Sequence, residues 1–176
     1  FVANGHVQPD IHKYSATSTH GERNLVFHNR GARYEAFDEV GRTAGPAFAR
    51  ERVTRGAAYG DYDNDGDLDL LLSNNNQPAE LLRNDGGNRR SWLQIELVGT
   101  KSNRTGIGAR VAVTCGGVTQ RQWMRSGSSY LSQSMLRLHF GLAEARVAES
   151  VEVQWPSGAT QRFTAVEANQ RVVIEE

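Results

Sequence analysis

Apolar and polar residues alternate in short runs along the second half of the chain, and glycine or polar turns separate the runs. A period of two residues is typical of strands that bury one face. The pattern predicts seven strands, at residues 92–98, 109–114, 119–125, 136–140, 150–155, 160–163 and 171–174. Such a series of short strands and turns predicts an all-β sandwich.

Two connections in this half have their own signals. Residues 142–149 are short and Ala-rich and predict a single helical turn. Residues 155–159 read WPSGA and predict a tight hairpin, because Pro presets one turn torsion and Gly adopts a positive φ.

The first half carries a weaker strand pattern. Residues 25–29 and 33–37 flank a turn and predict a hairpin. Residues 38–55 predict a long connection with one short helical turn. Residues 56–60 and 68–73 predict two strands on either side of the most acidic segment of the chain.

Five carboxylates occupy alternate positions of that segment, DYDNDGDLD at residues 61–69. Like charges this close repel one another in a folded loop unless a cation neutralises them. The prediction is a Ca²⁺ site, because calcium takes about six to eight oxygen ligands and no sulfur or imidazole group is nearby. The expected ligands are the side chains of Asp61, Asp63, Asp65 and Asp69 and the backbone carbonyl of Asp67. The alternative is an acidic, solvated turn without metal.

Gly66 stands at the sixth position of this segment, where the chain turns sharply and a left-handed conformation is inexpensive only without a Cβ. An EF-hand would carry Glu at the twelfth position and continue into an amphipathic helix. Here the twelfth position is Leu72, and residues 68–73 read as a buried strand. The segment therefore predicts a calcium loop between two strands rather than an EF-hand.

Charge and cysteine content exclude several other classes. The chain has 20 basic and 20 acidic residues and no basic run, so neither nucleic acid nor an anionic membrane surface is expected as a main partner. No apolar run has the length of a membrane span. The single cysteine, Cys115, excludes an internal disulfide and is predicted to be a small buried strand residue rather than a reactive thiol.

An internal similarity suggests a repeat. Residues 25–31 and 80–86 share two apolar residues, a basic residue, Asn, a polar residue and Gly, and Asn29 and Asn84 lie 55 positions apart. This period is in the range of a propeller blade with an insertion. A repeat of this kind cannot bury both faces alone, so we expect neighbouring blades from elsewhere in the chain or from partner subunits. Because the chain begins at Phe1, we expect a processed start or a piece of a longer protein.

The sequences GDYDNDGDLD at 60–69 and LLRNDG at 81–86 together resemble the FG-GAP/VCBS repeat of integrin-like β-propellers. In that family the aspartates bind calcium between adjacent strands. The resemblance implies that residues 1–90 form a propeller segment with its calcium loop at 61–69. It also implies the metal-binding role for Asp61, Asp63, Asp65, Asp67 and Asp69.

The second half resembles the ASPIC/UnbV domain found at the C-terminus of the CRTAC group, a family named for a cartilage acidic protein. The matching stretches are GIGARV at 106–111, GSSYLSQS at 127–134, RLHFGL at 137–142 and WPSG at 155–158. The resemblance implies an ASPIC/UnbV-like β-sandwich at residues 91–176, and the order of the two segments is the order in that family. Its members are described as secreted or cell-surface calcium-binding proteins, and a bacterial branch is encoded beside enediyne biosynthesis genes.

No catalytic set assembles from the sequence. His139 is predicted to be a structural histidine rather than a general base, because no acidic partner is placed by the pattern. The polar loop from Arg125 to Ser134 is the best candidate for a ligand-contact surface, and its alternative is an internally bonded structural loop. The three tryptophans, Trp92, Trp123 and Trp155, are expected in the core or at the rim of the sandwich.

The expected function is a non-enzymatic, calcium-binding module for interaction or structural assembly, located in the extracellular space, at the cell surface or in the periplasm. Its expected partners are other propeller blades or protein subunits of a larger assembly. Two alternatives stay open. One is an accessory or enzyme-like protein of a biosynthetic pathway, as the enediyne-linked branch suggests. The other is a carbohydrate-binding module with a glycan ligand, for which exposed aromatic side chains on one face of the sandwich would be the sign.

Overall fold

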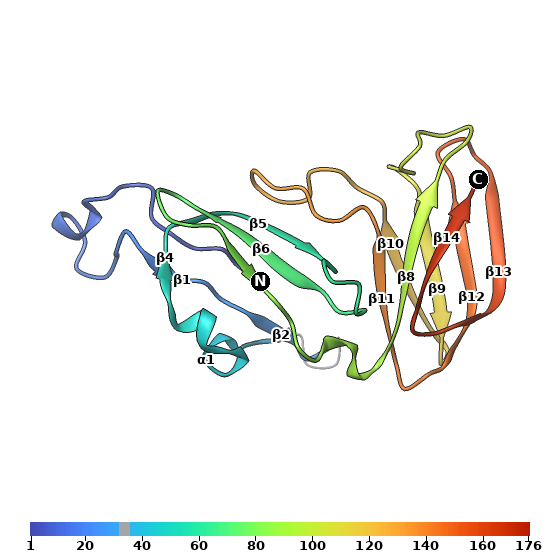
Figure 1. Cartoon of the computed structure of the whole chain (residues 1–176), viewed down its shortest axis with the longest axis horizontal. Helices are drawn as coiled ribbons and strands as arrows, with labels where there is room; N and C mark the ends of the chain where they lie inside the picture. Colours follow the sequence, from blue (N-terminus) through green and yellow to red (C-terminus); the bar gives the residue numbers. More distant parts are fainter. Residues whose placement is uncertain (32–35) are drawn as a thin grey trace. The chain divides into compact units, whose positions relative to one another are not determined.

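The computed structural model of the protein describes residues 1–31 and 36–176, and strands make up most of its regular structure (Figure 1). The strands are β1 (Glu22–Arg23), β2 (Phe27–Asn29), β3 (Phe37–Glu39), β4 (Glu51–Arg52), β5 (Thr54–Gly60), β6 (Asp69–Asn74), β7 (Glu80–Leu82), β8 (Ser91–Val98), β9 (Arg110–Cys115), β10 (Val118–Trp123), β11 (Leu138–Ala143), β12 (Val147–Gln154), β13 (Thr160–Glu167) and β14 (Gln170–Glu175). The helices are η1 (Ile11–Lys13), α1 (Gly41–Ala44), η2 (Pro46–Ala49) and η3 (Gly87–Arg89). Within the described residues, no helix is both long enough and apolar enough to cross a membrane.

The chain divides into two compact units. The N-terminal unit comprises Phe1–Ala58, Leu70–Leu82 and Ser129–Ser132, and the C-terminal unit comprises Tyr59–Asp69, Arg83–Ser128 and Gln133–Glu176. The acidic loop therefore belongs to the same compact unit as the strands β8 to β14, whereas β6 and β7, which follow it directly, belong to the N-terminal unit. The division into domains at residues 1–90 and 91–176 stays a prediction from the sequence.

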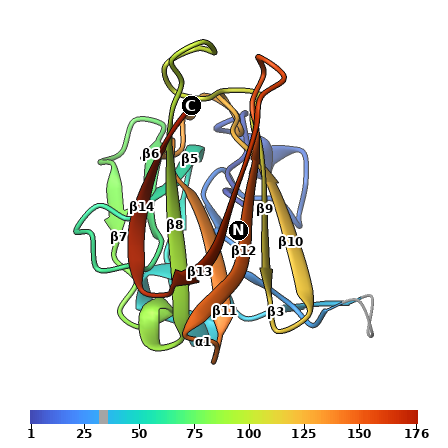
Figure 2. The same cartoon turned by 90° about the vertical axis from the view of Figure 1, so that its right-hand side faces the viewer.

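Two sheets build the C-terminal unit (Figure 2). One is antiparallel, with the strand order β10-β9-β12-β13. The other has the order β11-β8-β14, in which β11 is antiparallel and β14 parallel to β8. All seven strands predicted for this half are present, with ends shifted by a few residues.

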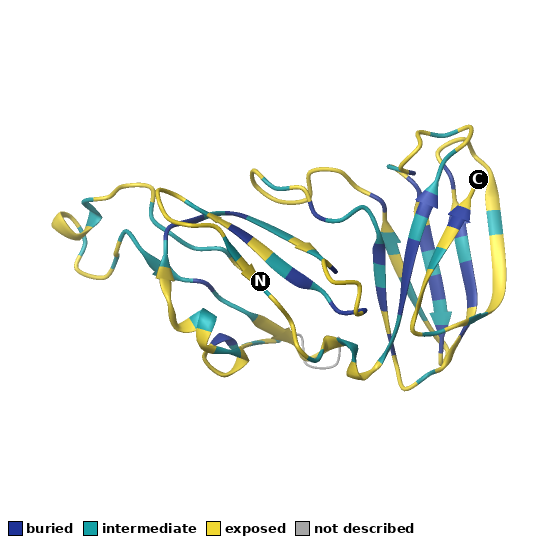
Figure 3. Ribbon diagram, in the orientation of Figure 1, coloured by how far each residue is buried: buried dark blue, intermediate teal, exposed yellow. Residues whose placement is uncertain are grey.

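A single apolar core lies between these sheets because alternate residues of their strands point inward (Figure 3). Its fully buried members include Leu93, Ile95, Val111, Val113, Phe140, Val151 and Val153. Cys115 is buried at the end of β9, as predicted. The alternation that marks the sequence is therefore the alternation between this core and the outer faces of the two sheets.

One of the expectations for this half needs correction. The helical turn expected at residues 142–149 is wrong, because Leu142 lies in β11, Ala148 lies in β12 and both side chains are buried in the core. Trp155 is 4% exposed and belongs to the core, whereas Trp123 is 52% exposed and lies outside it. The hairpin at 155–159 is confirmed, since the Trp155 amide donates to the Ala159 carbonyl at 2.9 Å and Gly158 has a φ of 92°.

The N-terminal unit is built from smaller sheets. The strands β5, β6 and β7 form one sheet, and β2 pairs with β3 and β1 with β4 in antiparallel fashion. The predicted hairpin is confirmed by the β2–β3 pair, although its second strand is seen at Phe37–Glu39 and residues 33–35 of the expected strand lie outside the described residues. The connection expected at residues 38–55 with one short helical turn contains two short helices, α1 and η2, and the strand β4.

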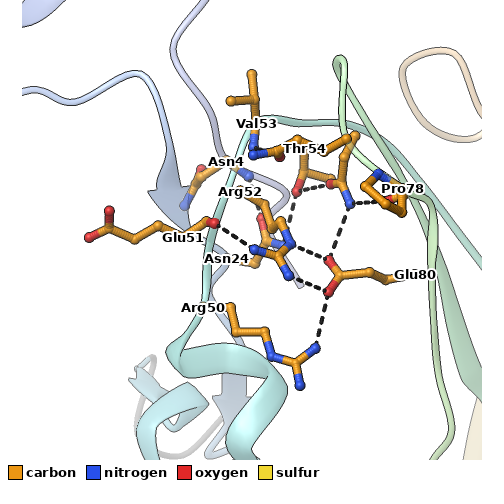
Figure 4. A network of polar contacts seen from close by, with 11 residues as sticks. Asn4, Asn24, Arg50, Glu51, Arg52, Val53, Thr54, Pro78 and Glu80 are labelled. Carbon is orange, nitrogen blue, oxygen red and sulfur yellow. Dashed lines mark hydrogen bonds and ion pairs between the residues drawn. The ribbon is translucent and has the colours of Figure 1, made fainter.

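Polar contacts hold much of this unit together (Figure 4). The Glu80 carboxylate accepts hydrogen bonds from Arg50 at 3.4 Å, from Arg52 at 3.1 and 3.2 Å and from Asn74 at 3.2 Å. Burial acts to raise the pKa of Glu80, but the hydrogen bonds from Arg52 and Asn74 outweigh it and lower the pKa. Glu80 is therefore a charged anchor between separate segments of the unit.

The N-terminal unit buries few apolar side chains compared with the C-terminal unit. Among the described residues of the N-terminal unit, Val53 and Leu72 are the buried apolar side chains of appreciable size. Its exposed large apolar side chains are Phe1, Val2, Val7, Tyr14, Phe27, Phe37, Leu71, Leu81, Tyr130 and Leu131. The unit thus exposes apolar surface that a self-sufficient core would cover.

Candidate metal centre

The acidic segment connects β5 to β6 and forms a tight loop. Asn64 has a φ of 59° and Gly66 a φ of 98°, which are left-handed conformations that Asn and Gly adopt more readily than other residues. These two residues turn the chain so that carboxylate oxygens of Asp61, Asp63 and Asp65 lie within 4.8 Å of one another. Three of the five predicted ligands are therefore brought together.

Asp61 is the buried anchor of this group. Its Oδ1 accepts a hydrogen bond from the Asp65 amide at 3.0 Å, and its Oδ2 accepts from the Gly66 amide at 3.1 Å. The side-chain amide of Gln94, on β8, donates to the same Oδ2 at 2.6 Å. Asp61 thus has its carboxylate fixed in position by three donors.

Asp67 and Asp69 are also buried but are anchored to the segment that follows β7. Oδ2 of Asp67 accepts from the amides of Gly86 at 3.2 Å and Gly87 at 3.1 Å. Oδ1 of Asp69 accepts from the Asn84 amide at 2.8 Å, and its Oδ2 accepts from the Tyr62 amide at 3.2 Å. Backbone amides therefore hold both carboxylates, a role that the sequence did not reveal.

The electrostatic environment of Asp67 is unfavourable for its charge. Burial and the nearby charges of Asp65 and Asp69 raise its pKa, while the amide hydrogen bonds from Gly86 and Gly87 act in the opposite direction. Repulsion among the carboxylates, expected from their spacing, therefore acts on the folded loop.

The residues fit a hard cation in two respects. The side chains of the group offer oxygen ligands alone, and among the described residues Oδ1 of Asp67 is a buried oxygen without any hydrogen-bond donor. Buried polar atoms normally have a partner, so an unpartnered carboxylate oxygen calls for an explanation. A bound ion would explain it. Asp63 and Asp65 are exposed, and Asp63 accepts no hydrogen bond within the described part of the chain.

Arg137 brings a positive charge to the acidic loop and hydrogen-bonds to it. Its guanidinium donates to Oδ1 of Asn64 at 3.0 Å, to Oε1 of Gln94 at 2.9 Å and to the carbonyl of Asp61 at 3.3 Å. Because Gln94 donates to Asp61 and accepts from Arg137, it links the guanidinium to the carboxylate. Both hydrogen-bonding groups of this buried side chain are thereby satisfied.

Gly66 packs closely against the sandwich. A Cβ at Gly66 would lie 2.0 Å from Cε2 of the Trp92 ring, so no larger residue fits without movement. His139 stacks on Trp92, with 6.3 Å between ring centroids, and its Nε2 lies 2.9 Å from the Gly66 carbonyl oxygen. Since a carbonyl oxygen only accepts, Nε2 is the donor. His139 therefore has the structural hydrogen bond expected of it.

The loop from Arg125 to Ser134, predicted as a ligand-contact surface, is divided between the two compact units, because Ser129–Ser132 belong to the N-terminal unit. Tyr130 is exposed. A cavity of about 550 Å³ in the C-terminal unit is lined by Arg125, Ser128 and Ser134 but not by Tyr130 or His139. Its lining contains no Asp, Glu or His, so the acid and base of a hydrolytic site do not meet there.

Several residues of the centre could not be found in the sequence. Gln94, Trp92, His139 and Arg137 contact the loop from positions 26 to 76 residues away along the chain, and nothing in their local pattern distinguishes them from other strand residues. The segment at 84–87 does carry a signal, because most of it belongs to the internal repeat. Its contribution of backbone amides becomes visible only in the fold.

Residues 99–176 match a known protein family, described as ASPIC and UnbV. The matched segment contains the strands β9 to β14 of the sandwich. The match supports the resemblance of the C-terminal half to that family.

Cartilage acidic protein 1 of Homo sapiens is 31% identical over 135 residues, which is 74% of this chain and 20% of that protein. The protein of the same name from Xenopus tropicalis is 33% identical over 135 residues, which is 73% of this chain and 21% of that protein. The alignment thus spans about a fifth of the length of these curated relatives. The alignment covers 74% of this chain, whereas residues 99–176 make up less than half of it. The similarity to cartilage acidic protein 1 therefore extends upstream of residue 99.

Proposed function

We propose that this chain is a calcium-binding module for interaction or structural assembly, without enzymatic activity, and that the acidic loop holds a structural calcium ion. The observation that carries the proposal is the convergence of Asp61, Asp63 and Asp65 within 4.8 Å, in a loop that also contains the unpartnered buried oxygen of Asp67. Oxygen ligands of this kind favour calcium over transition metals.

The residues of the loop have distinct tasks in this proposal. Asp61 and Asp69 are fixed by amide donors and define the frame, whereas the exposed Asp63 and Asp65 close on the ion from the solvent side. A bound calcium ion supplies positive charge that turns mutual repulsion into coordination. Because the ion binds the folded loop and not the unfolded chain, it stabilises the C-terminal unit to which the loop belongs.

We also infer that the N-terminal unit is part of an integrin-like propeller, as the FG-GAP resemblance implies. The unit buries few apolar side chains and exposes a cross-strand pair, Leu71 on β6 and Leu81 on β7. Blades of a propeller cover such faces with their neighbours. The partners we propose are therefore other blades, from the same protein or from another subunit.

The proposed absence of enzymatic activity is supported by the lining of the 550 Å³ cavity, which offers arginine and neutral side chains but no acid or histidine. A location outside the cytoplasm is proposed because a solvent-accessible loop with exposed ligands resembles the weak calcium sites of extracellular modules, which need about 10⁻⁴–10⁻³ M calcium. The similarity to cartilage acidic protein 1 supports the same assignment.

The test is calcium binding measured by calorimetry on protein stripped of metal, together with thermal unfolding in calcium and in EDTA. At free calcium of about 100 times the Kd, one site adds about 2.7 kcal/mol to the free energy of unfolding. Magnesium should bind more weakly, because it requires near-octahedral geometry and retains its water. An unchanged melting curve in EDTA and the absence of heat on titration would contradict the proposal.

Asp63→Asn is the most informative variant. Asp63 is exposed and accepts no hydrogen bond from the described residues, so its loss should weaken calcium binding while leaving the metal-free protein as stable as before. The matched control is Asp85→Asn, which removes an exposed carboxylate outside the loop that pairs only with Arg83 among the described residues. Equal calcium affinity in both variants would refute the assignment of Asp63 as a ligand.

A further inference from the structure

The outer face of the sheet β10-β9-β12-β13 carries a groove of about 630 Å³. All of its lining residues belong to the C-terminal unit. Its floor is made of small side chains, among them Ala112 and Thr114 on β9 and Ser150 on β12. This groove is separate from the aspartate loop.

The strand register places two arginines beside the tryptophan of the groove. Trp123 on β10 pairs directly with Arg110 on β9, and Arg121 pairs with Ala112. Directly paired residues and their diagonal neighbours on the same face have Cα atoms about 4.5–8 Å apart. Arg110, Arg121 and Trp123 therefore form one cluster beside the small residues of the floor.

Trp123 holds two guanidinium groups in place. The Cζ atoms of Arg110 and Arg125 lie 5.1 Å and 4.8 Å from the centroid of its ring, within the range of cation–π contacts. Stacking restricts the arginine rotamers while leaving their N–H groups available. Among the residues that the structure describes, the guanidinium groups of Arg110, Arg121 and Arg125 donate no hydrogen bond and form no ion pair.

The rest of the lining carries both signs of charge, with Glu149 and Glu152 beside Arg162. Arg162 on β13 forms an ion pair with Glu152 on β12 at 3.2 Å. The unpaired positive charge of the groove is thus concentrated at Arg110 and Arg121, while Arg125 stacks on Trp123 without lining the groove. Free guanidinium groups of this kind recognise carboxylate and sulfate oxygens through paired N–H donors.

The chemistry of the groove favours a glycan over an acidic peptide. A peptide that adds a strand needs the free edge of a sheet, whereas this groove lies on a sheet face whose backbone groups are already paired. The hydroxyls of Thr114 and Ser150 and the carboxylate of Glu149 line the groove and can exchange hydrogen bonds with sugar hydroxyls.

We infer that this groove binds an acidic polysaccharide, with its uronate carboxylate or sulfate groups held by Arg110 and Arg121 and its sugar hydroxyls against the small polar floor. The inference is independent of the calcium proposal, because no residue of the aspartate loop lines the groove. Trp123 is a half-exposed reporter at the site, so occupancy should change its fluorescence.

The test is a titration of the full chain, followed by tryptophan fluorescence, with oligogalacturonate as the carboxylate probe and heparin oligosaccharide as the sulfate probe. The measurements are made in EDTA, so that calcium bridges between glycan and protein do not contribute and a failed calcium proposal leaves the result unaffected. We expect saturable binding of at least one probe that weakens as salt is raised. Dextran, which is neutral, should not bind.

Arg110→Gln and Arg121→Gln should each weaken binding by about tenfold or more, because each removes a charged hydrogen-bond donor. The matched control is Arg104→Gln, an exposed arginine outside the groove, which should leave the affinity within about twofold of the unchanged protein. Melting temperatures of all three variants verify that they fold. Absence of binding to both probes, equal affinity in Arg110→Gln and Arg104→Gln, or tighter binding of polyglutamate would each overturn the inference.

Discussion

The side-chain amide of Gln94 donates a 2.6 Å hydrogen bond to the carboxylate of Asp61, and both side chains are buried. Gln94 lies on a central strand of the sandwich, and Asp61 begins the acidic loop. The first predicted metal ligand is therefore positioned by the C-terminal core and not by the loop alone. The contact lies within the compact unit that contains both the loop and β8.

Replacement of Gln94 by Ala should destabilise the protein. It leaves the buried Asp61 carboxylate with one donor fewer and removes an acceptor from Arg137, which together should reduce the free energy of unfolding by about 1–3 kcal/mol. Denaturant unfolding measures the change. The control is Gln154→Ala, because Gln154 is exposed on the outer face of β12. If both variants lost the same small amount, the contact would not be structurally important.

Gly66→Ala should be among the most disruptive single-methyl changes in the chain. Its φ of 98° costs about 1–2 kcal/mol with a Cβ present. The overlap of that Cβ with the Trp92 ring adds about 1–3 kcal/mol. Thermal unfolding should reveal the loss, and calcium affinity should fall because the loop must move.

Gly116→Ala separates these two contributions. Gly116 has a φ of 57°, but no atom outside its chain neighbours lies within 4 Å of the position that a Cβ would occupy there, so this substitution should cost only the backbone part. The difference between the two variants measures the contact of Gly66 with Trp92. Equal destabilisation by both substitutions would mean that the tryptophan moves aside freely.

Much of the C-terminal fold could be predicted because the alternation of apolar and polar residues within each strand indicates which face is buried. Val111 and Val113 are buried, while Arg110 before them and Ala112 between them face outward, and the sequence alone carries that alternation. The prediction of a helical turn at residues 142–149 was wrong because it relied on alanine content, which reflects only the local helix propensity of the segment. Burial of Leu142 and Ala148 in the core, a long-range effect, favoured extended strands instead.

The aspartate loop could be predicted as a unit because its spacing is local, but its supports could not. Gln94, Trp92 and His139 reach the loop from two strands of the sandwich, and only the pairing of β8 with β11 brings them together. The exposure of the Trp123 side chain could not be predicted from the sequence either. Its strand alternates as the others do, but β10 is an edge strand, where one face of a large side chain is accessible to ligands.

Two neighbouring leucines on β6 test the proposal that other propeller blades cover the exposed apolar face of the N-terminal unit. Leu72 is 1% exposed and Leu71 is 53% exposed. Leu72→Ala should lower the free energy of unfolding by about 2–5 kcal/mol, whereas Leu71→Ser should change it by no more than about 0.5 kcal/mol. Light scattering should show less self-association for Leu71→Ser, because its apolar face is reduced. Comparable destabilisation by both would indicate that the chain already covers Leu71.

The environment of Glu176 leads to a prediction about stability at acidic pH. Burial acts to raise the pKa of its carboxyl, but hydrogen bonds from Ser157, Ser102 and Lys101 outweigh it and lower the pKa from 4.5 to about 2. Its Oε2 accepts from the amides of Thr100 at 3.1 Å, Lys101 at 2.9 Å and Ser102 at 2.6 Å. The carboxylate therefore ties the chain segment at 100–102 to the end of the C-terminal unit.

Because the pKa is lower in the folded than in the unfolded state, the contribution of Glu176 to stability is complete above pH 4.5 and is lost as the pH falls toward about 2. Glu176→Gln should melt at a lower temperature than the unchanged protein at neutral pH, and the difference should shrink across that interval. The control is Glu175→Gln, whose side chain is exposed and should leave the pH dependence unaltered. A constant difference between Glu176→Gln and the unchanged protein from pH 5 to about pH 2 would contradict the assigned role, because an ionic contact must weaken as its carboxylate is protonated.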